Sequence, residues 1–390
     1  MQRLLCLLPS CLIDCMILNM ENTAKNQPRS LKIKEKVFDL PLYLPDATRA
    51  VVRSTDMIDV KNAGIEALMV NAYHLMHDPG MSVLKKFDGL KNFMGWDGLL
   101  ASDSGGFQIL SIIYANKSLG TVTDRAVIFR RQNKKYILTP EKSIEMQFKI
   151  GSDIMICLDD CPKGSASKTE IAGSVRRTIA WAKRCKAEFE KQIGARKTAK
   201  ENTPLLFAVV QGGEHKDLRQ ECAEGLLEIG FPGFAFGGWP MGKDGKFDYE
   251  IVRHTASLIP AQFPKFALGI GKPQEIIEGF KMGYDIFDCV LPTRDARHER
   301  LYIFSADPGK TDILKVEKVH SYLQIGEEKY TRDRRPISAF CDCHTCSNYS
   351  RAFLHHLFKI KDTSAYRLAT IHNLRMYSMV MDALRHSKTE

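Results

Sequence analysis

The stretch Asp285-Ile286-Phe287-Asp288-Cys289-Val290-Leu291-Pro292-Thr293-Arg294 places a carboxylate, that of Asp288, at the end of a short apolar run. Such a run predicts a buried strand, and Pro292 predicts a turn directly after it. A second stretch, Ser102-Asp103-Ser104-Gly105-Gly106-Phe107-Gln108, has the same order, because the apolar run before it also ends at an aspartate. Two aspartates that each end a strand indicate a pocket suited to covalent chemistry on a cationic centre.

Similar short apolar runs occur between and around these two stretches, and helical patterns separate most of them. The expected strands are Ala67–Asn71, Leu99–Asp103, Ile154–Asp159, Leu205–Gln211, Gly233–Gly237, Phe266–Gly269 and Ile286–Asp288. The expected helices include Ser143–Ile150, Lys168–Ile193, Lys216–Ile229 and Pro273–Gly283. Buried strands that alternate with helices predict a parallel sheet. With seven strands and an eighth still to be placed, the pattern favours an α/β fold of the (β/α)₈ TIM-barrel type over a doubly wound sheet, and no Gly-x-Gly-x-x-Gly follows the first strand.

The residues at the strand ends carry the functional signal. In a barrel these ends open onto one face, where active sites lie. Three of them are carboxylates without a neighbouring cation in the sequence, which would be costly in a site that served packing alone. The strand-end set is Asn71, Asp103, Asp159, Gln211, Gly238 and Asp288.

Composition sets the broad class. The chain has 390 residues, of which 44% are hydrophobic and 26% charged, as in an ordinary globular protein. Its formal net charge of +10 favours a polyanionic partner such as nucleic acid. The 11 cysteines lack the spacing of a disulfide framework, which favours a reducing, cytoplasmic location with one metal site.

Three segments are expected along the chain. Residues 1–37 predict a flexible N-terminal extension; an apolar run near Met1 suggests a leader, but Pro9 and Asp14 interrupt it and no cleavage site follows. The same run is too short and broken to span a membrane. Residues 38–300 predict the catalytic barrel, and residues 301–390 a zinc-binding subdomain with closing C-terminal helices.

Cys341-x-Cys343-x-x-Cys346 is the most specific local motif, because it lets three thiolates converge on one tetrahedral ion. A closed set of four such ligands holds a structural Zn²⁺ and leaves no position open for chemistry. The sequence leaves four histidines as candidates for the remaining ligand: His344, His355, His356 and His372. We expect His372, on the interpretation that it opens a helix and projects back onto the cysteine loop.

These motifs occur in an order that resembles the bacterial-type tRNA-guanine transglycosylases. The resemblance covers residues 38–385 and includes Asn71-Ala72-Tyr73-His74-Leu75, Gln211-Gly212-Gly213 and Tyr349-Ser350-Arg351-Ala352 besides the stretches above. It implies a barrel with a zinc subdomain, and an enzyme that exchanges guanine at the tRNA wobble position for a 7-deazaguanine base in queuosine biosynthesis. It also implies a homodimer.

The resemblance further implies the roles of individual residues. Asp288 matches the nucleophile that attacks the ribose, and Asp103 matches the general acid and base. The base-binding positions it implies are Asp159, Gln211, Gly238, Phe107, Leu268 and Cys161. Arg294 and Arg297 match residues that hold RNA phosphates.

Two departures from the family pattern concern the incoming base. Lys243 stands where bacterial members have a glutamate that helps bind the ammonium of 7-aminomethyl-7-deazaguanine (preQ1), and Pro240 removes a backbone N–H nearby. Met241 is bulky where queuine-using relatives have glycine. We expect preQ1 as the incoming base, with queuine as the alternative. A non-catalytic, zinc-containing tRNA-binding subunit is the alternative function, and the presence of both Asp103 and Asp288 argues against it.

Overall fold

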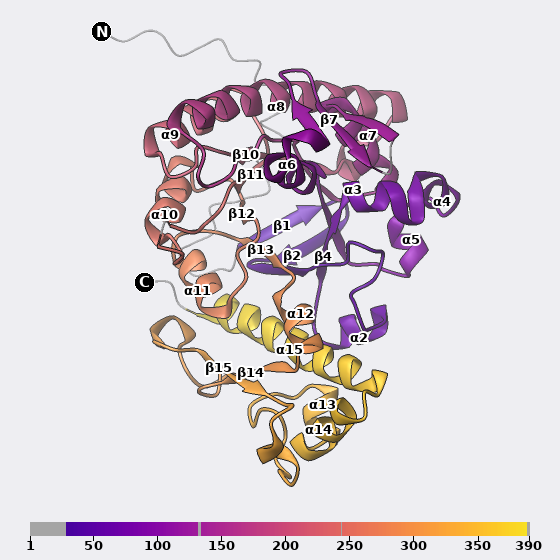
Figure 1. Cartoon of the computed structure of the whole chain (residues 1–390), viewed down its shortest axis with the longest axis vertical. Coiled ribbons are helices and arrows are strands. Elements are labelled where there is room, and N and C mark those ends of the chain that lie inside the picture. Colours follow the sequence, from indigo (N-terminus) through magenta and orange to yellow (C-terminus); the bar gives the residue numbers. More distant parts are fainter. Residues whose placement is uncertain (1–28, 132–133, 243, 388–390) are drawn as a thin grey trace.

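The computed structural model describes residues 29–131, 134–242 and 244–387. Its centre is an eight-stranded sheet that curls into a barrel, with helices around it (Figure 1). The barrel strands are β3 (Leu42–Pro45), β4 (Ala67–Asn71), β5 (Leu99–Asp103), β9 (Ile154–Ile156), β10 (Leu205–Val210), β11 (Gly233–Phe236), β12 (Lys265–Ala267) and β13 (Ile286–Cys289). Each strand lies beside its neighbours in chain order, and every pairing within the sheet is parallel.

The barrel closes between β3 and β4. A parallel bridge joins Asp46 to Met69, and the Ala47 N–H donates to the Met69 carbonyl at 2.7 Å. Consecutive order and closure together confirm the (β/α)₈ barrel and exclude the doubly wound alternative. The eighth strand is β3, a four-residue segment that begins just after Pro41.

Helices follow the strands around the outside of the barrel. The barrel helices are α2 (Met57–Asn62), α3 (Ala72–Leu75), α4 (Met81–Lys86), α5 (Leu90–Met94), α6 (Gly106–Ala115), α7 (Pro140–Ile150), α8 (Lys168–Arg196), α9 (Lys216–Ile229), α10 (Tyr249–Leu258), α11 (Pro273–Lys281), α12 (Leu291–Arg297) and α15 (Thr363–His386). A kinked segment, η1 (Met76–Gly80), joins α3 to α4, and Asp78 within it is extended, with φ of −146° and ψ of 112°. Local sequence sets these boundaries: the Thr139 side chain caps α7, Pro140 occupies its first turn, and Gly151 ends it in the left-handed region. No helix within the described ranges is long and apolar enough to cross a membrane.

A hairpin of β1 (Ser30–Ile33) and β2 (Lys36–Asp39) covers the amino ends of the barrel strands. Leu31, Ile33 and Phe38 belong to the same buried cluster as the side chains inside the barrel. Ion pairs fix the hairpin region to the starts of β9 and β13, with Lys34 on Asp153 at 2.7 Å and Arg29 on Asp285 at 2.9 Å. The expectation of a flexible segment is therefore wrong for residues 30–37, whereas residues 1–28 lie outside the described residues.

A three-stranded antiparallel sheet between α6 and α7 was not predicted from the sequence. It consists of β6 (Gly120–Val122), β7 (Val127–Arg131) and β8 (Lys134–Leu138). Phe129 of β7 is buried against the helices that follow β4 and β5. The insertion thus lies beside the carboxyl end of β5, which carries Asp103.

The zinc subdomain is inserted between β13 and the last barrel helix, and it lies below the barrel in Figure 1. It contains β14 (Arg300–Phe304), β15 (His320–Gln324), α13 (His344–Asn348) and α14 (Arg351–Lys359). After it, α15 returns to the barrel and packs on α12, β3 and α11. The boundaries between the three expected segments, at residues 37 and 300, stay predictions.

Candidate active site

Two carboxylates stand at the barrel mouth, at the ends of β5 and β13, as the sequence predicts. The Asp103 carboxylate accepts hydrogen bonds from the Asn71 side chain at 2.6 Å, the Gly105 N–H at 2.9 Å and the Ala72 N–H at 3.3 Å. The Asp288 carboxylate accepts one from the Gly269 N–H at 2.9 Å. Asp103 is therefore held from three sides by the loops after β4 and β5, while the described residues hold Asp288 less tightly.

Both carboxylates have unusual proton affinities. Burial raises the pKa of Asp103 to about 7, although its hydrogen-bond donors oppose the shift. Burial also raises the pKa of Asp288 to about 7, and the negative charges of Asp103 and Asp46 add to the effect. Two interacting carboxylates with such pKa values share about one proton near neutral pH, so one can act as an acid while the other is ionised. Asp46, just after β3, was missed because β3 itself was not identified.

Asp159 and Gln211 lie together on the other half of the mouth. The Gln211 side-chain N–H₂ donates to the Asp159 carboxylate at 2.6 Å. Burial raises the pKa of Asp159 to about 6, although the bond from Gln211 opposes the shift. Asp159 and Gln211 follow β9 and β10 instead of ending them, because these two strands are shorter than predicted. Gly238 has φ of 96°, and a side chain there would approach Gln211.

Arg219 of α9 supports this half of the mouth, and sequence reasoning missed it. Its fully buried guanidinium donates to the carbonyls of Gly213 at 2.8 Å, Val210 at 3.1 Å and Gly237 at 3.1 Å. It thereby ties the loop that follows Gln211 to the loop that carries Gly238. No motif marked it, because an arginine in an amphipathic helix ordinarily faces solvent.

Aromatic side chains border the same region. The Phe107 ring lies 5.2 Å from the Trp239 ring, centroid to centroid, and both remain partly exposed at 38% and 50%. Leu268 is half-buried against the barrel core. Cys161 is buried, and burial raises the pKa of its thiol to about 12, so it is neutral. Trp239 was not predicted as a site residue, although its exposed indole lies against the Phe107 ring.

The predicted phosphate ligands lie on α12, directly after the Asp288 strand. Arg294 is exposed, and Arg297 is half-buried with its guanidinium on the Thr293 carbonyl at 2.8 Å. Burial lowers the pKa of Arg297, and the nearby cations Arg53 and Arg294 lower it further. These three arginines therefore form a cationic group beside Asp288.

The metal-ligand motif is assembled in the zinc subdomain. The ligand atoms of Cys341, Cys343, Cys346 and His372 all lie within 4.8 Å of one another, which fits one tetrahedral ion. The His372 Nδ1 atom faces the Cys346 sulfur at 3.3 Å, while Nε2 lies 2.7 Å from the Tyr302 carbonyl. A carbonyl at Nε2 fixes the proton there and leaves Nδ1 free for a metal. The choice of His372 agrees with this cluster, but the reason given was wrong, because α15 begins at Thr363 and His372 lies inside it.

Comparisons with known proteins agree with this arrangement. The sequence model of the family described as "Queuine tRNA-ribosyltransferase" matches residues 27–389. A queuine tRNA-ribosyltransferase of Staphylococcus haemolyticus is 37% identical over 355 residues, which cover 90% of this chain and 86% of the relative. One from Dehalococcoides mccartyi is 38% identical over 372 residues, covering 93% and 87% of the two chains. One from Vibrio atlanticus is 36% identical over 362 residues, covering 92% and 89%.

Proposed function

Because the chain belongs to the queuine tRNA-ribosyltransferase family and is thus a tRNA-guanine transglycosylase, we propose that it replaces guanine at the tRNA wobble position through a covalent bond between Asp288 and the ribose. The observation that carries the proposal is the pair of carboxyl groups, Asp103 and Asp288, whose pKa values are both raised to about 7 at one barrel mouth. A nucleophile must be ionised while its partner acid is protonated, and a pair that shares one proton supplies both states.

The first half-reaction expels guanine. An oxygen of ionised Asp288 bonds to the ribose anomeric carbon, and the bond from that carbon to guanine breaks with its electron pair leaving on the base. Asp103 transfers its proton to the departing guanine, so the products are a neutral base and an Asp288–ribose ester. A positively charged sugar develops on the way, and a nearby carboxylate stabilises it, as in retaining glycoside hydrolysis.

The second half-reaction reverses these steps with a different base. Ionised Asp103 takes a proton from the incoming 7-deazaguanine, whose ring nitrogen then attacks the anomeric carbon. The ester bond breaks, and its electron pair returns to Asp288. Asp103 is again protonated, so the enzyme is ready for another cycle.

Base recognition uses the other half of the mouth. Asp159 accepts from the donor edge of the guanine-like ring, and the Gln211 amide and Gly238 N–H donate to its carbonyl oxygen. The bond between Gln211 and Asp159 supports this proposal, since it fixes a donor and an acceptor side by side. Phe107 and Leu268 clamp the ring faces, Cys161 lines the pocket as a neutral thiol, and Arg294 and Arg297 hold phosphates next to the flipped-out nucleotide.

The incoming base is preQ1 in this proposal, with queuine as the alternative. In a 7-deazaguanine, the carbonyl oxygen and the substituent at position 7 lie on the same edge of the ring. A base whose carbonyl oxygen binds at Gly238 therefore directs its substituent toward the residues that follow Gly238. There, the exposed Trp239 ring offers an ammonium group a cation–π contact. Met241 is 42% exposed and bridges to Phe247, so its bulk gives no support to the exclusion of a larger substituent. Lys243 lies outside the described residues.

Covalent trapping tests the proposal. Purified protein incubated with a wobble-G tRNA should form a denaturant-resistant protein–RNA band, and labelled guanine should enter the tRNA. Asp288→Asn should abolish both while it retains folding, zinc and RNA binding. A band that persists in Asp288→Ala would refute the nucleophile, and a wild-type protein that binds tRNA without exchange would favour the non-catalytic subunit. Competition of labelled guanine with preQ1 and with queuine then decides the incoming base.

Assembly as a homodimer is also part of the proposal. Phe340, Phe353 and Ile360 of the zinc subdomain are exposed at 40%, 41% and 57%, so they offer apolar area to an interface. A second copy of the chain would cover them.

A further inference from the structure

A cavity opens beside Asp103, and the mechanism above does not use it. It has a volume of about 320 Å³ and lies between α3, α6 and the inserted sheet. Its walls include Tyr73 and His74 from the segment after β4, and Arg130 and Arg131 from β7. It adjoins the active site, since Asn71 and Ala72, which donate to Asp103, directly precede Tyr73.

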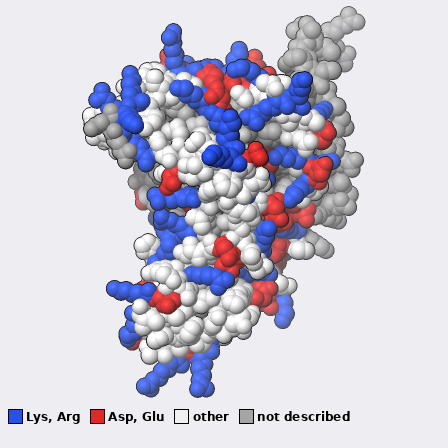
Figure 2. All heavy atoms as spheres, turned by 90° about the vertical axis from the view of Figure 1, so that its right-hand side faces the viewer, with Lys and Arg blue, Asp and Glu red and all other residues white. Residues whose placement is uncertain are grey.

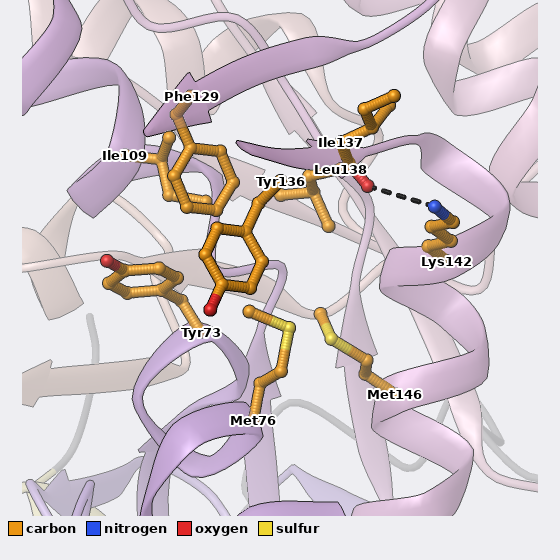
Figure 3. Close-up of a pocket in the computed structure, with 9 residues that line it drawn as sticks. All are labelled: Tyr73, Met76, Ile109, Phe129, Tyr136, Ile137, Leu138, Lys142 and Met146. Carbon is orange, nitrogen blue, oxygen red and sulfur yellow. Dashed lines mark hydrogen bonds between the residues drawn. The ribbon is translucent and has the colours of Figure 1, made fainter. Parts of the chain in front are cut away.

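The floor of this cavity is aromatic and apolar. Tyr73 and Phe129 line it and also line a smaller pocket of about 50 Å³, where Tyr136, Met76 and Met146 converge on them (Figure 3). The rings of Phe129 and Tyr136 stack at 5.3 Å. The cavity therefore combines an apolar base with a cationic rim, a combination typical of sites for nucleotides.

Arg131 supplies the most specific evidence. Its guanidinium carbon lies 5.6 Å above the Tyr73 ring, and its Nη1 atom is buried without a hydrogen-bond acceptor among the described residues. The buried Nε2 of His77, which packs on the same Tyr73 ring, also has no partner there. A buried donor without an acceptor costs free energy, and an oxygen-bearing ligand that reached Arg131 would remove that cost.

The position of the cavity in the barrel shows what that ligand could be. Around the mouth, the strands that carry the proposed base-binding residues, β9 to β12, lie on one side of Asp103 and Asp288, and β3 and β4 lie on the other. Arginines follow this second side from α12 to the inserted sheet, namely Arg294, Arg297, Arg53, Arg49, Arg130 and Arg131. Arg49 and Arg131 both lie close enough to His74 to lower its pKa, and the acid near them, Asp46, is hydrogen-bonded to the Thr48 N–H at 3.2 Å. Lys and Arg side chains are spread over the face of Figure 2, from the barrel to the zinc subdomain, with acidic side chains between them.

We propose that the cavity lined by Tyr73, His74, Arg130 and Arg131 binds a phosphodiester of the RNA strand that flanks the exchanged nucleotide. Arg131 holds the phosphate oxygens, and Arg130 adds charge from the rim. The strand then crosses the mouth between two phosphate anchors, with Arg294 and Arg297 beside Asp288 and Arg131 beside Asp103. The exchanged base turns inward between them, toward β9 to β12. This inference rests on the proposed function, since it requires RNA at the mouth.

Equilibrium binding of an anticodon stem-loop RNA tests the site. Arg131→Gln should weaken RNA binding about tenfold. The slope of log affinity against log salt concentration should also become shallower by about one unit, because about one counterion fewer is released. The KM for free guanine should not change. Arg253→Gln, at an exposed residue of α10 that does not line the cavity, is the matched control and should leave affinity and salt dependence at the wild-type values.

Neutral phosphate analogues sharpen the test. In a series of stem-loop RNAs, each RNA carries one uncharged methylphosphonate at a different loop position. For one of these RNAs, Arg131→Gln should cause no further loss of affinity, because the phosphate charge that Arg131 binds is already absent. Wild-type affinity and salt dependence in Arg131→Gln, or equal losses on every RNA, would overturn the site. Should Arg131→Gln fail to fold, Arg130→Gln, at an exposed residue, carries the same test. Failure of wild-type guanine exchange would instead refute the proposed function, irrespective of these binding results.

Discussion

Asp288 occupies a position where ionisation costs stability. Its pKa is raised from about 3.8 to about 7, mainly by burial, so the folded state binds its proton more tightly than the unfolded state does. Its contribution to the free energy of unfolding is therefore largest below pH 4 and is lost as pH rises through 7. Asp288→Asn should raise the free energy of unfolding by about 1–3 kcal/mol at pH 8, and this gain should disappear near pH 4.

Denaturant unfolding of both proteins at pH 4, 6 and 8 measures this effect. The matched control is Asp124→Asn, because Asp124 is largely exposed, with 91% of its side chain accessible. Its free energy of unfolding should differ little from the wild-type value across the range. A gain from Asp288→Asn that is independent of pH would contradict the raised pKa.

Arg219 acts on the base pocket through the backbone, so its effect should be selective. Its guanidinium bonds three carbonyls on the loops that carry Gln211 and Gly238, and lysine cannot reproduce that fork. Arg219→Lys should raise the KM for free base about tenfold and leave the KM for tRNA within about twofold. Steady-state kinetics with each substrate varied in turn would separate the two. Equal losses for both substrates would indicate a purely structural role.

Single residues also show where sequence reasoning succeeds and fails. Asp103 and Asp288 were found because each ends a clear apolar run. Asp46 was missed because the strand before it has only four residues, follows Pro41 and ends at Pro45. Arg219 and Arg131 were missed because their roles come from three-dimensional packing, which leaves no periodic signal in the chain.

At the scale of elements, the zinc cluster joins the cysteine loop to the middle of α15. His372→Ala removes one of four ligands, so the protein should lose its zinc and its C-terminal region should unfold first, since metal binding supplies folding free energy. His344→Ala is the matched control, because His344 lies between two of the cysteines but is exposed and outside the cluster. Elemental analysis should find about one zinc per chain in the control and none in His372→Ala. Full zinc in His372→Ala would refute the ligand set.

The β1–β2 hairpin should behave as part of the barrel core. Phe38 is 8% exposed and packs with the barrel interior, so Phe38→Ala should lower the free energy of unfolding by about 3–5 kcal/mol. Its neighbour Val37 is 60% exposed, and Val37→Ala should change stability by less than about 0.5 kcal/mol. Denaturant unfolding compares the two. Equal, small effects would mean that the hairpin does not contribute to the core.

The helices and strands that are long and have a regular hydrophobic period were the ones that could be predicted from the sequence. Lys216–Ile229 was predicted with its observed bounds, and α8 differs only by three residues at its end. The hairpin was missed because its polar, lysine-rich composition hides the alternation of Leu31, Ile33 and Phe38. The sheet β6–β8 was missed because its strands have only three to five residues, and Arg130, Arg131, Lys134 and Lys135 interrupt their apolar pattern.

At the scale of the whole molecule, the exposed aromatic surface of the zinc subdomain should set the oligomeric state. Phe353 is stacked on Tyr349 at 5.1 Å and is 41% exposed. If the proposed homodimer uses this surface, Phe353→Glu should make the protein monomeric, because a charge at an apolar interface is costly to bury. Light scattering measures the mass of each form. Phe87→Glu, at a 47% exposed phenylalanine after α4, is the control and should remain dimeric.

The insertion of the zinc subdomain before α15 has a consequence for synthesis on the ribosome. Strand β3 pairs with β13, which is made roughly 240 residues later, and α15 follows only after the metal-binding loop. At about 5–20 residues per second, β3 therefore waits on the order of 10–50 s for its partner. The last metal ligand along the chain, His372, lies within α15, so metal capture and barrel completion both wait for the synthesis of this helix. A nascent chain that stops before α15 lacks both, which leaves it recognisable to proteases as an unfinished product.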